Sequence, residues 1–332
     1  MSESSNRREF IKESVVATAA AVAVTRTPAI GATSSRQPVE TENGIPVGRL
    51  KNLKVSRIFI GCNQVSGYAH GRDLRYLPDL MRSYQTDEKV LDTWELCEET
   101  GINMVLSDPF ERPVSLMKKY RKERGGKIQW LSEVHPSKPY HECSLADMKE
   151  NIRVVMDNGP DALYVQGGIG DSFVMRGAVS DLGEVLEDMK ATGLPSGIGS
   201  HSIETVKALI KNGIEPDFFF KTYHSDNYFS ATPKDQRVEF NVDSGSENDH
   251  DNIWCIKPDE TREVMRQTEI PWIAFKVLAA GALDPREAFR FAFEGGADFI
   301  CVGMFDFQVP RNVETIRQLL AGDLSRERPW RA

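Results

Sequence analysis

The segment from residue 270 to residue 312 constrains the fold of this chain more than any other. Two short apolar runs, at residues 271–277 and 298–303, flank an amphipathic run at residues 285–294 that ends in a Gly-Gly pair. This order predicts a strand, a helix and a second strand. Parallel strands need a covered crossover of this kind, and such crossovers are nearly always right-handed. The segment therefore predicts a parallel sheet that is buried on both faces.

The same alternation continues along most of the chain. Apolar runs predict eight strands, at residues 57–61, 102–107, 128–134, 162–166, 196–200, 217–221, 271–277 and 299–303. Amphipathic runs predict eight helices, at residues 87–100, 113–123, 145–158, 179–191, 202–211, 258–268, 285–294 and 312–320. Eight such pairs over about 280 residues are typical of a TIM barrel. We therefore predict a single-domain α/β fold, a (β/α)8 TIM barrel, at residues 51–325.

The N-terminal residues predict a targeting segment. Arg7 and Arg8 precede an apolar run at residues 15–24 and a small-residue region that ends at Ala32, and this pattern resembles a twin-arginine export signal. The apolar run is shorter than the roughly 20 residues that span a bilayer, so we expect no stable membrane anchor. We predict a signal peptide at residues 1–32 and a disordered leader at 33–50. The twin-arginine export machinery would then deliver the protein to the periplasm or outside the cell.

Charge and cysteine usage narrow the class of partner. The formal net charge is −8, whereas a nucleic-acid site or a basic membrane patch needs excess Lys and Arg on one face. We therefore expect a small-molecule substrate and no nucleic acid. The five cysteines show no CxxC pair and no regular spacing, so they do not predict a disulfide framework.

Polar residues gather at the predicted C-terminal ends of the strands, where a TIM barrel carries its active site. The candidates for catalysis at these ends are Asp108, Glu133, Gln166 and Lys221. Loops are polar in general, so ordinary solvated residues are the competing interpretation.

Three of the six histidines belong to the same rim of the predicted barrel. They are His135, His201 and His224. Two imidazoles and a carboxylate such as Glu133, with one position left open, are what a divalent metal ion needs to polarise a hydroxy-carbonyl. A metal site is therefore one possible use of this rim, and plain hydrogen bonding is the other.

Two long loops, at residues 64–84 and 224–255, are predicted beside this rim. Loops longer than about 15 residues in a compact domain are usually functional or disordered. The aromatic residues in and beside these loops are Tyr68, Tyr223, Tyr228 and Trp254. Aromatic rings over a polar floor suit a sugar or another polyhydroxylated ligand, so we predict a carbohydrate-like substrate.

Four segments together resemble an aldo/keto reductase barrel. They are residues 86–103, the SGIGSH stretch at 196–201, the FKVLAAGAL stretch at 275–283, and residues 303–314. The resemblance implies a TIM barrel that uses NADPH. It also implies that the segments after the seventh and eighth strands hold the phosphates and adenosine of the cofactor. The residues at comparable places here are Lys276, Gly281, Arg311 and Asn312.

The catalytic groups of that family are not retained in place. The family's Asp position holds Leu106, and its Tyr position falls near Glu111. Its Lys is replaced by Ser132 or Glu133, and its His by Gln166. In the reductases, the Tyr donates a proton to the carbonyl oxygen while Lys and His tune its acidity. We therefore do not expect standard carbonyl reduction.

Several functions remain open. The first is an exported enzyme that acts on a carbohydrate-type carbonyl or hydroxyl through rearranged acids and bases, with or without NADPH. The second is a metal-assisted sugar isomerase, epimerase or hydrolase. The third is a Schiff-base lyase, in which Lys221 and Lys276 face each other and lower each other's pKa; a structural ion pair of Lys221 with Glu133 or Asp306 competes with it. The fourth is a non-catalytic ligand-binding barrel.

Overall fold

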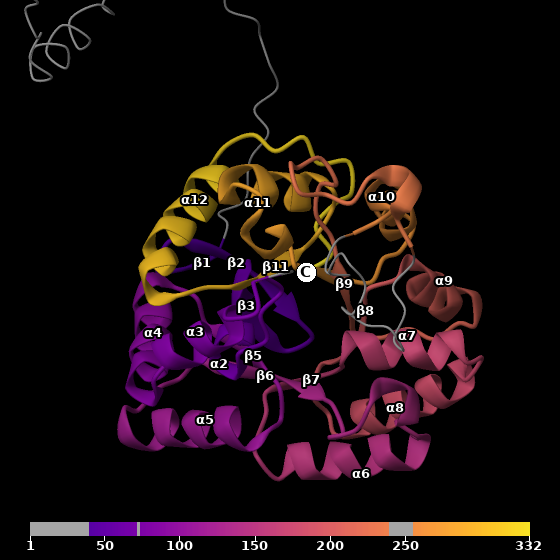
Figure 1. Ribbon diagram of the computed structural model, residues 1–332. Coiled ribbons are helices and arrows are strands. Elements are labelled where there is room, and N and C mark those ends of the chain that lie inside the picture. Colours follow the sequence, from indigo (N-terminus) through magenta and orange to yellow (C-terminus); the bar gives the residue numbers. More distant parts are fainter. Residues whose placement is uncertain (1–39, 72–73, 239–254) are drawn as a thin grey trace, which may run out of the picture. The chain divides into compact units, whose positions relative to one another are not determined.

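Eight parallel strands close into a barrel (Figure 1). The computed structural model describes residues 40–71, 74–238 and 255–332. The barrel strands are β4 (Ile58–Gly61), β5 (Met104–Ser107), β6 (Gln129–Val134), β7 (Ala162–Val165), β8 (Ser196–Ser200), β9 (Phe218–Thr222), β10 (Trp272–Phe275) and β11 (Phe299–Gly303). They pair in the order β10-β11-β4-β5-β6-β7-β8-β9, and β9 pairs with β10 to complete the ring. All eight predicted strands are confirmed.

Helices alternate with these strands around the outside of the barrel (Figure 1). The predicted ones are confirmed as α4 (Asp87–Thr100), α5 (Glu111–Glu123), α6 (Leu145–Met156), α8 (Val179–Ala191), α9 (Ile203–Lys211), α10 (Pro258–Arg266), α11 (Pro285–Glu294) and α12 (Val309–Ala321). Three more were not predicted: α2 (Asn63–Ser66), α3 (Leu77–Tyr84) and α7 (Gly167–Met175). Within the described part of the chain, no helix is long and apolar enough to cross a bilayer. The (β/α)8 fold is as predicted.

The helix boundaries follow local capping chemistry. Thr86 starts α4, and its side chain accepts a hydrogen bond from the backbone N–H of Lys89 at 3.3 Å. Ser144 and Asp147 form a reciprocal capping box at the start of α6. Gly101 ends α4 at a φ of 99°, a conformation that an L-amino acid with a side chain rarely adopts. These local signals explain why the sequence predicted the helix positions well.

A small antiparallel sheet precedes the barrel, and its presence corrects one prediction. Strands β1 (Thr41–Glu42), β2 (Ile45–Leu50) and β3 (Leu53–Ser56) form an antiparallel sheet. Leu50 and Val55 are buried and belong to the cluster that fills the barrel interior. The disordered leader predicted at 33–50 is therefore wrong for residues 41–50, because they form strands and bury Ile45 and Leu50 in the core. Residues 33–39 and the predicted signal peptide lie outside the described residues.

The packed domain also continues past its predicted end at residue 325. Asp298 is fully buried just before β11, and its carboxylate accepts hydrogen bonds from Arg326 at 3.2 Å and from Arg328 at 2.7 Å. The ring of Trp330 lies against the guanidinium groups of Arg57 and Arg326, at 4.3 and 3.8 Å from its centroid. A buried carboxylate needs such partners, since losing one partner leaves an uncompensated charge. The C-terminal residues therefore belong to the fold.

Candidate active site

Glu133 is the centre of a hydrogen-bonded group at the C-terminal end of the barrel. Its Oε1 accepts a hydrogen bond from the Tyr164 hydroxyl at 2.7 Å, and its Oε2 lies 3.0 Å from Nδ1 of His135. Glu133 and Tyr164 are direct partners in the register of β6 and β7. Leu131 fills the barrel interior, and side chains alternate along a strand, so Glu133 faces inward as well. The barrel thus carries a carboxylate at its mouth with two fixed partners.

Asp108 supplies a second carboxylate, directly after β5. It is 2% exposed, and it accepts hydrogen bonds from the Ser66 hydroxyl at 2.6 Å and from the Phe110 N–H at 3.1 Å. Burial raises the pKa of Asp108, and the nearby charge of Glu133 adds to the rise, while the two hydrogen bonds oppose it. We call Asp108, Glu133, His135 and Tyr164 the carboxylate cluster. The charge of Glu133 thus contributes to the raised pKa of Asp108.

Three phenol groups belong to the carboxylate cluster or lie near it. Burial, and then the charges of Asp108 and Glu133, raise the pKa of Tyr68 to about 12. Burial and the charge of Glu133 likewise raise the pKa of Tyr140 to about 12. Complete burial, and then the charge of Glu133, raise the pKa of Tyr164 well above its ordinary value. All three phenols therefore keep their protons at neutral pH and can donate them in hydrogen bonds.

Sequence reasoning missed two of these phenols. Tyr164 could have been found, because it follows Ala162 by two residues and so shares the inward face of its strand. Tyr140 lies in a single 3-10 turn, η1 (Tyr140–Glu142), which has no sequence pattern. The rings of Phe110 and Tyr140 lie 5.1 and 5.6 Å from the ring of His135. Tyr164 on β7 and Tyr140 in η1 thus bring phenols to the carboxylate cluster.

Gln166 acts as a helix cap in this structure. Its Oε1 accepts hydrogen bonds from the N–H groups of Gly168 at 2.6 Å and Ile169 at 3.2 Å, at the start of α7. Its Nε2 donates to the Tyr140 hydroxyl at 3.3 Å. An added Cβ at Gly170 would lie 2.3 Å from the carbonyl oxygen of Gly199, so glycine lets α7 pack closely on β8. Gln166 therefore positions Tyr140 and the first turn of α7.

His201 forms a pair with Asp171, a residue that sequence reasoning missed. Nδ1 of His201 lies 3.0 Å from Oδ2 of Asp171, which is fully buried on α7. Asp171 also accepts hydrogen bonds from the His201 N–H at 2.7 Å and the Thr205 hydroxyl at 2.6 Å. Burial lowers the pKa of His201, although Asp171 opposes this. The carboxylate fixes the orientation of the imidazole.

The two predicted lysines do not form the expected facing pair. Phe218 and Phe220 fill the barrel interior, whereas Phe219 packs on the outside, so Lys221 points outward as well. Its Nζ donates to the carbonyl oxygens of His201 at 2.6 Å and Thr222 at 2.8 Å. The buried ion pair with Glu133 or Asp306 is also wrong, because Tyr164 and His135 bind Glu133, while Tyr84 and Lys89 bind Asp306. Lys221 is thus not part of the carboxylate cluster.

Lys276 lies at the mouth of the barrel beside a different loop. Its Nζ is 2.7 Å from Nε2 of His70, which comes from the segment after β4. The backbone of Lys276 has a φ of 55°, and Ala279 and Ala280 also have positive φ values. Three such residues that are not glycine in one loop indicate local strain, which is common at functional sites.

The predicted metal centre is wrong for the described residues. No group of three or more His, Cys, Asp or Glu side chains there could hold a metal ion. His135 and His201 are held by Glu133 and Asp171. Nδ1 of His224 is bound to the Ser225 carbonyl at 2.8 Å, and its Nε2 accepts from the Cys255 N–H at 2.7 Å. Separate partners orient the three imidazoles, so they do not converge.

The predicted cofactor residues separate into two places. Arg311 and Asn312 lie on the first turn of α12, and Arg311 approaches Asp284, in the loop after β10, at 4.0 Å. The Asn312 side chain is 2% exposed, and its amide nitrogen has no partner among the described atoms. Gly281 belongs to the loop after β10 and has a φ of 89°. Lys276 follows the same strand, but its Nζ contacts His70 and not Arg311 or Asn312.

The aromatic residues predicted in and beside the two long loops do not lie together over one site. Tyr223 is 1% exposed and packs on the outside of the barrel against Trp272 and Phe291. Tyr228 lies 5.9 Å, between ring centroids, from His224. Trp254 lies outside the described residues. The loop at 64–84 contains α2 and α3, and from it Tyr68 reaches the carboxylate cluster.

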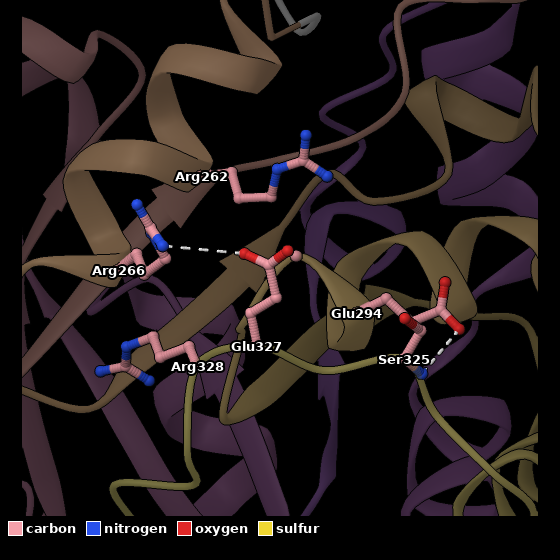
Figure 2. A pocket seen from close by; sticks show the side chains of 7 residues that line it. Arg262, Arg266, Glu294, Ser325, Glu327 and Arg328 are labelled. Atoms are coloured by element: carbon pink, nitrogen blue, oxygen red, sulfur yellow. Dashed lines mark hydrogen bonds and ion pairs between the residues drawn. The ribbon is translucent and has the colours of Figure 1, made fainter.

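A separate crevice of about 170 Å³ lies between α10, α11 and the C-terminal segment (Figure 2). Arg266 and Glu327 form an ion pair across it at 3.8 Å, and the Ser325 N–H donates to Glu294 at 3.2 Å (Figure 2). Glu294 ends α11 just before β11 begins, so the crevice lies at the opposite end of the barrel from the carboxylate cluster. Active sites of TIM barrels lie at the C-terminal strand ends, so we do not place the chemistry in this crevice.

Solved structures share this architecture, although no protein-family model and no curated sequence matches the chain. A Pseudomonas aeruginosa protein described as an aldo-keto reductase superposes with a TM-score of 0.58 at 17% identity, over 85% of this chain and 97% of that one. The holo form of an aldo-keto reductase from Bacillus halodurans gives 0.54 at 14% identity, over 87% and 100%. The fold is that of the aldo-keto reductases. At these identities the likeness concerns the fold alone.

The stability of Asp108→Asn, compared with that of the unsubstituted chain at the same pH, should increase as the pH rises. The pKa of Asp108 in the folded state lies above its ordinary value of 3.8, so the folded chain holds this proton more tightly than the unfolded chain. The stability that this proton provides is present at low pH and is lost as the pH rises through the raised pKa. The free energy of unfolding of Asp108→Asn minus that of the unsubstituted chain should therefore grow between about pH 3 and pH 7.

Urea unfolding at fixed pH values measures this difference. Asp79→Asn, at a carboxylate that is 80% exposed on α3, is the matched control. A difference for Asp108→Asn that stays constant over this pH range contradicts the prediction.

Proposed function

We propose that this chain is an exported enzyme with an aldo/keto-reductase-like barrel that acts on a carbohydrate-type carbonyl or hydroxyl by acid-base catalysis. The observation that carries the proposal is the position of Glu133, which is hydrogen-bonded to both Tyr164 and His135 at the C-terminal end of the barrel. Catalytic groups of this fold lie at that end. A carboxylate held by two donors there is oriented to take a proton from a bound substrate.

The proposal assigns a base and an acid of different character, and the charge of the base acts on the acid. Glu133 is the proton acceptor, and the Tyr164 and His135 contacts fix its direction. Tyr68 is 46% exposed, so a substrate can reach its hydroxyl, and its raised pKa keeps it protonated. The phenol can therefore donate a hydrogen bond to a carbonyl oxygen while the carboxylate takes a proton from the carbon or hydroxyl beside it. Sugars carry both groups on neighbouring carbons.

This arrangement supports proton transfer by an unusual set of residues. The base comes from β6, and the phenol comes from the segment after β4. Asp108 has a raised pKa and lies close enough to feel the charge of Glu133. Two neighbouring carboxyls in different environments are a common basis for assigning acid and base roles.

A nicotinamide cofactor fits the proposal at one end of the site. The buried Asn312 amide without a described partner and the exposed Arg311 guanidinium, both on the first turn of α12, suit an anionic phosphate. Lys276 adds a cation at the mouth of the barrel. Bound in its reduced form, the cofactor would supply a hydride to a carbonyl whose oxygen takes a proton from Tyr68, and in its oxidised form it would accept the hydride of a carbinol whose hydroxyl proton Glu133 takes.

Export is also part of the proposal. It is supported by Arg7 and Arg8 and by the short apolar run that follows them. A chain that carries Arg7→Lys and Arg8→Lys should stay in the cytoplasm, and cell fractionation with Arg26→Lys as the control measures this. Export of the doubly substituted chain would remove the twin-arginine route.

Replacing Glu133 with Gln should slow proton transfer by about a hundred- to ten-thousand-fold, because a neutral amide cannot take the proton. Exchange of substrate hydrogens with solvent deuterium, followed by NMR over a panel of aldoses and ketoses, detects this step without knowledge of the product. Glu142→Gln, at a side chain that is 58% exposed in the same segment, is the matched control. Equal exchange in Glu133→Gln and the unsubstituted chain would remove Glu133 from the mechanism.

Replacing Arg311 with Ala should weaken NADPH binding roughly tenfold, since one charge-assisted hydrogen bond to a phosphate is lost. Cofactor fluorescence titration measures the Kd. Arg153→Ala on α6 is the control, because the two side chains are almost equally exposed, at 77% and 78%. If the unsubstituted chain binds no NADPH up to millimolar concentration, the mechanism is free of nicotinamide.

A further inference from the structure

The loop after β11 presents an aromatic surface to solvent. We propose that this surface binds a sugar ring by stacking, so that the substrate is a glycoside or an oligosaccharide and not a single free sugar. The surface consists of Phe305, Phe307 and Tyr84, and we call it the aromatic platform. Its place in catalysis rests on the proposed function, whereas its binding of a sugar does not.

The platform is held in one geometry by ring contacts. The rings of Phe305 and Phe307 are stacked, with centroids 5.6 Å apart and planes 7° from parallel. Tyr84 meets both of them edge-on, at 5.2 and 6.2 Å and at angles of 85° and 88°. These are favoured arrangements for aromatic pairs. The Phe307 side chain nevertheless remains 66% exposed, so a fixed flat ring faces solvent.

Polar contacts brace the platform from the side. Asp306, between the two phenylalanines in sequence, accepts a hydrogen bond from the Tyr84 hydroxyl at 2.6 Å and from Lys89 at 2.9 Å. Partial burial raises the pKa of Asp306, but these two hydrogen bonds outweigh it and lower the pKa overall. The Phe305 N–H donates to the Gln308 side chain at 2.9 Å, which closes the 3-10 turn η4 (Asp306–Gln308). Asp306 is therefore ionised at neutral pH.

Single exposed aromatic residues are common and need no function. Phe229 is such a residue, since it is fully exposed and none of the described residues makes a ring contact with it. Phe307 differs, because the rings of Phe305 and Tyr84 pack against its ring. Tyr84 and Lys89 also bind the Asp306 carboxylate beside it, and the Gln308 side chain closes the turn. The platform contributes little to the core, since Phe307 is mostly exposed. We infer that its ordered geometry serves a ligand.

The chemistry of the platform matches one face of a pyranose. The C–H groups on such a face are apolar and pack on an aromatic ring, while the hydroxyl groups project from the edge of the sugar. Each Asp306 oxygen accepts one protein hydrogen bond and has a further acceptor position for a sugar hydroxyl. The phosphate site proposed above is formed by Arg311 and Asn312, whereas the polar group of the platform is a carboxylate, which accepts hydroxyl donors. A neutral sugar is the ligand class that fits.

The platform and the carboxylate cluster share one rim of the barrel. Strand β11 pairs with β4, β4 with β5, and β5 with β6. The platform follows β11, whereas Asp108 and Glu133 belong to β5 and β6. Two or three strand spacings separate them, about 10 to 14 Å along the rim. One sugar ring does not reach across this distance, but a linked pair or longer chain does.

The test is the binding of four hexasaccharides to the full chain by isothermal titration calorimetry. The probes are cellohexaose, xylohexaose, maltohexaose and laminarihexaose. At least one should bind, and Phe307→Ala should weaken its Kd about three- to tenfold through the loss of one stacking contact. Phe307→Tyr keeps the ring and should bind normally. Ile210→Ala, which removes an apolar side chain that is 45% exposed on α9, should also bind normally.

Deuterium exchange on single sugars should be the same in Phe307→Ala and in the unsubstituted chain, because the platform lies away from the carboxylate cluster. Equal binding of every hexasaccharide by Phe307→Ala and the unsubstituted chain overturns the proposal. The absence of hexasaccharide binding in the unsubstituted chain also overturns it. Binding that depends on Phe307 in a chain without deuterium exchange on any sugar would support the platform and would contradict the proposed acid-base function.

Discussion

Closure of the eight-stranded parallel barrel is the constraint on which the rest of this structure depends. Because every barrel strand pairs on both sides, the backbone groups of the strands are satisfied and none of these strands leaves an open edge. The alternation of side chains then divides the residues into two sets. Phe59, Phe218 and Phe220 fill the interior, while Phe219 and Lys221 face the helices. The same closure brings the C-terminal ends of all the strands to one rim, where the carboxylates meet.

The two ends of the barrel use buried charge differently. Near the start of β11, Asp298 has two guanidinium partners, Arg326 and Arg328, and it ties the C-terminal segment to the barrel. At the other end, Asp108 has no guanidinium partner, and its burial, together with the nearby charge of Glu133, raises its pKa. Compensated charge favours a fixed structure, whereas a carboxyl with a shifted pKa suits proton transfer. This contrast supports the proposal that the chemistry takes place at the C-terminal strand ends.

The position of the acids and bases shows how a shared fold can carry a changed site. By the sequence resemblance alone, the catalytic Asp and Tyr of aldo/keto reductases would fall at Leu106 and near Glu111. Phenols nevertheless reach the carboxylate cluster from β7, from the turn after β6 and from the segment after β4. All strand ends converge on one small volume, so a group from any of them can reach it. The fold therefore does not determine the reaction.

The sequence by itself determined the order and number of the strands and helices, because hydrophobic periodicity and helix capping are local properties. It also indicated the rim residues Asp108 and Glu133, because strand ends can be located from the same periodicity. Only the tertiary structure decided which rim residues meet. Strand register pairs Glu133 with Tyr164, and the ring of Phe307 stacks on that of Phe305. Separate partners bind His135, His201 and His224, so among the described residues these imidazoles do not form a metal site. These contacts join residues distant in the chain, and the direction of each side chain depends on neighbours that local patterns do not specify.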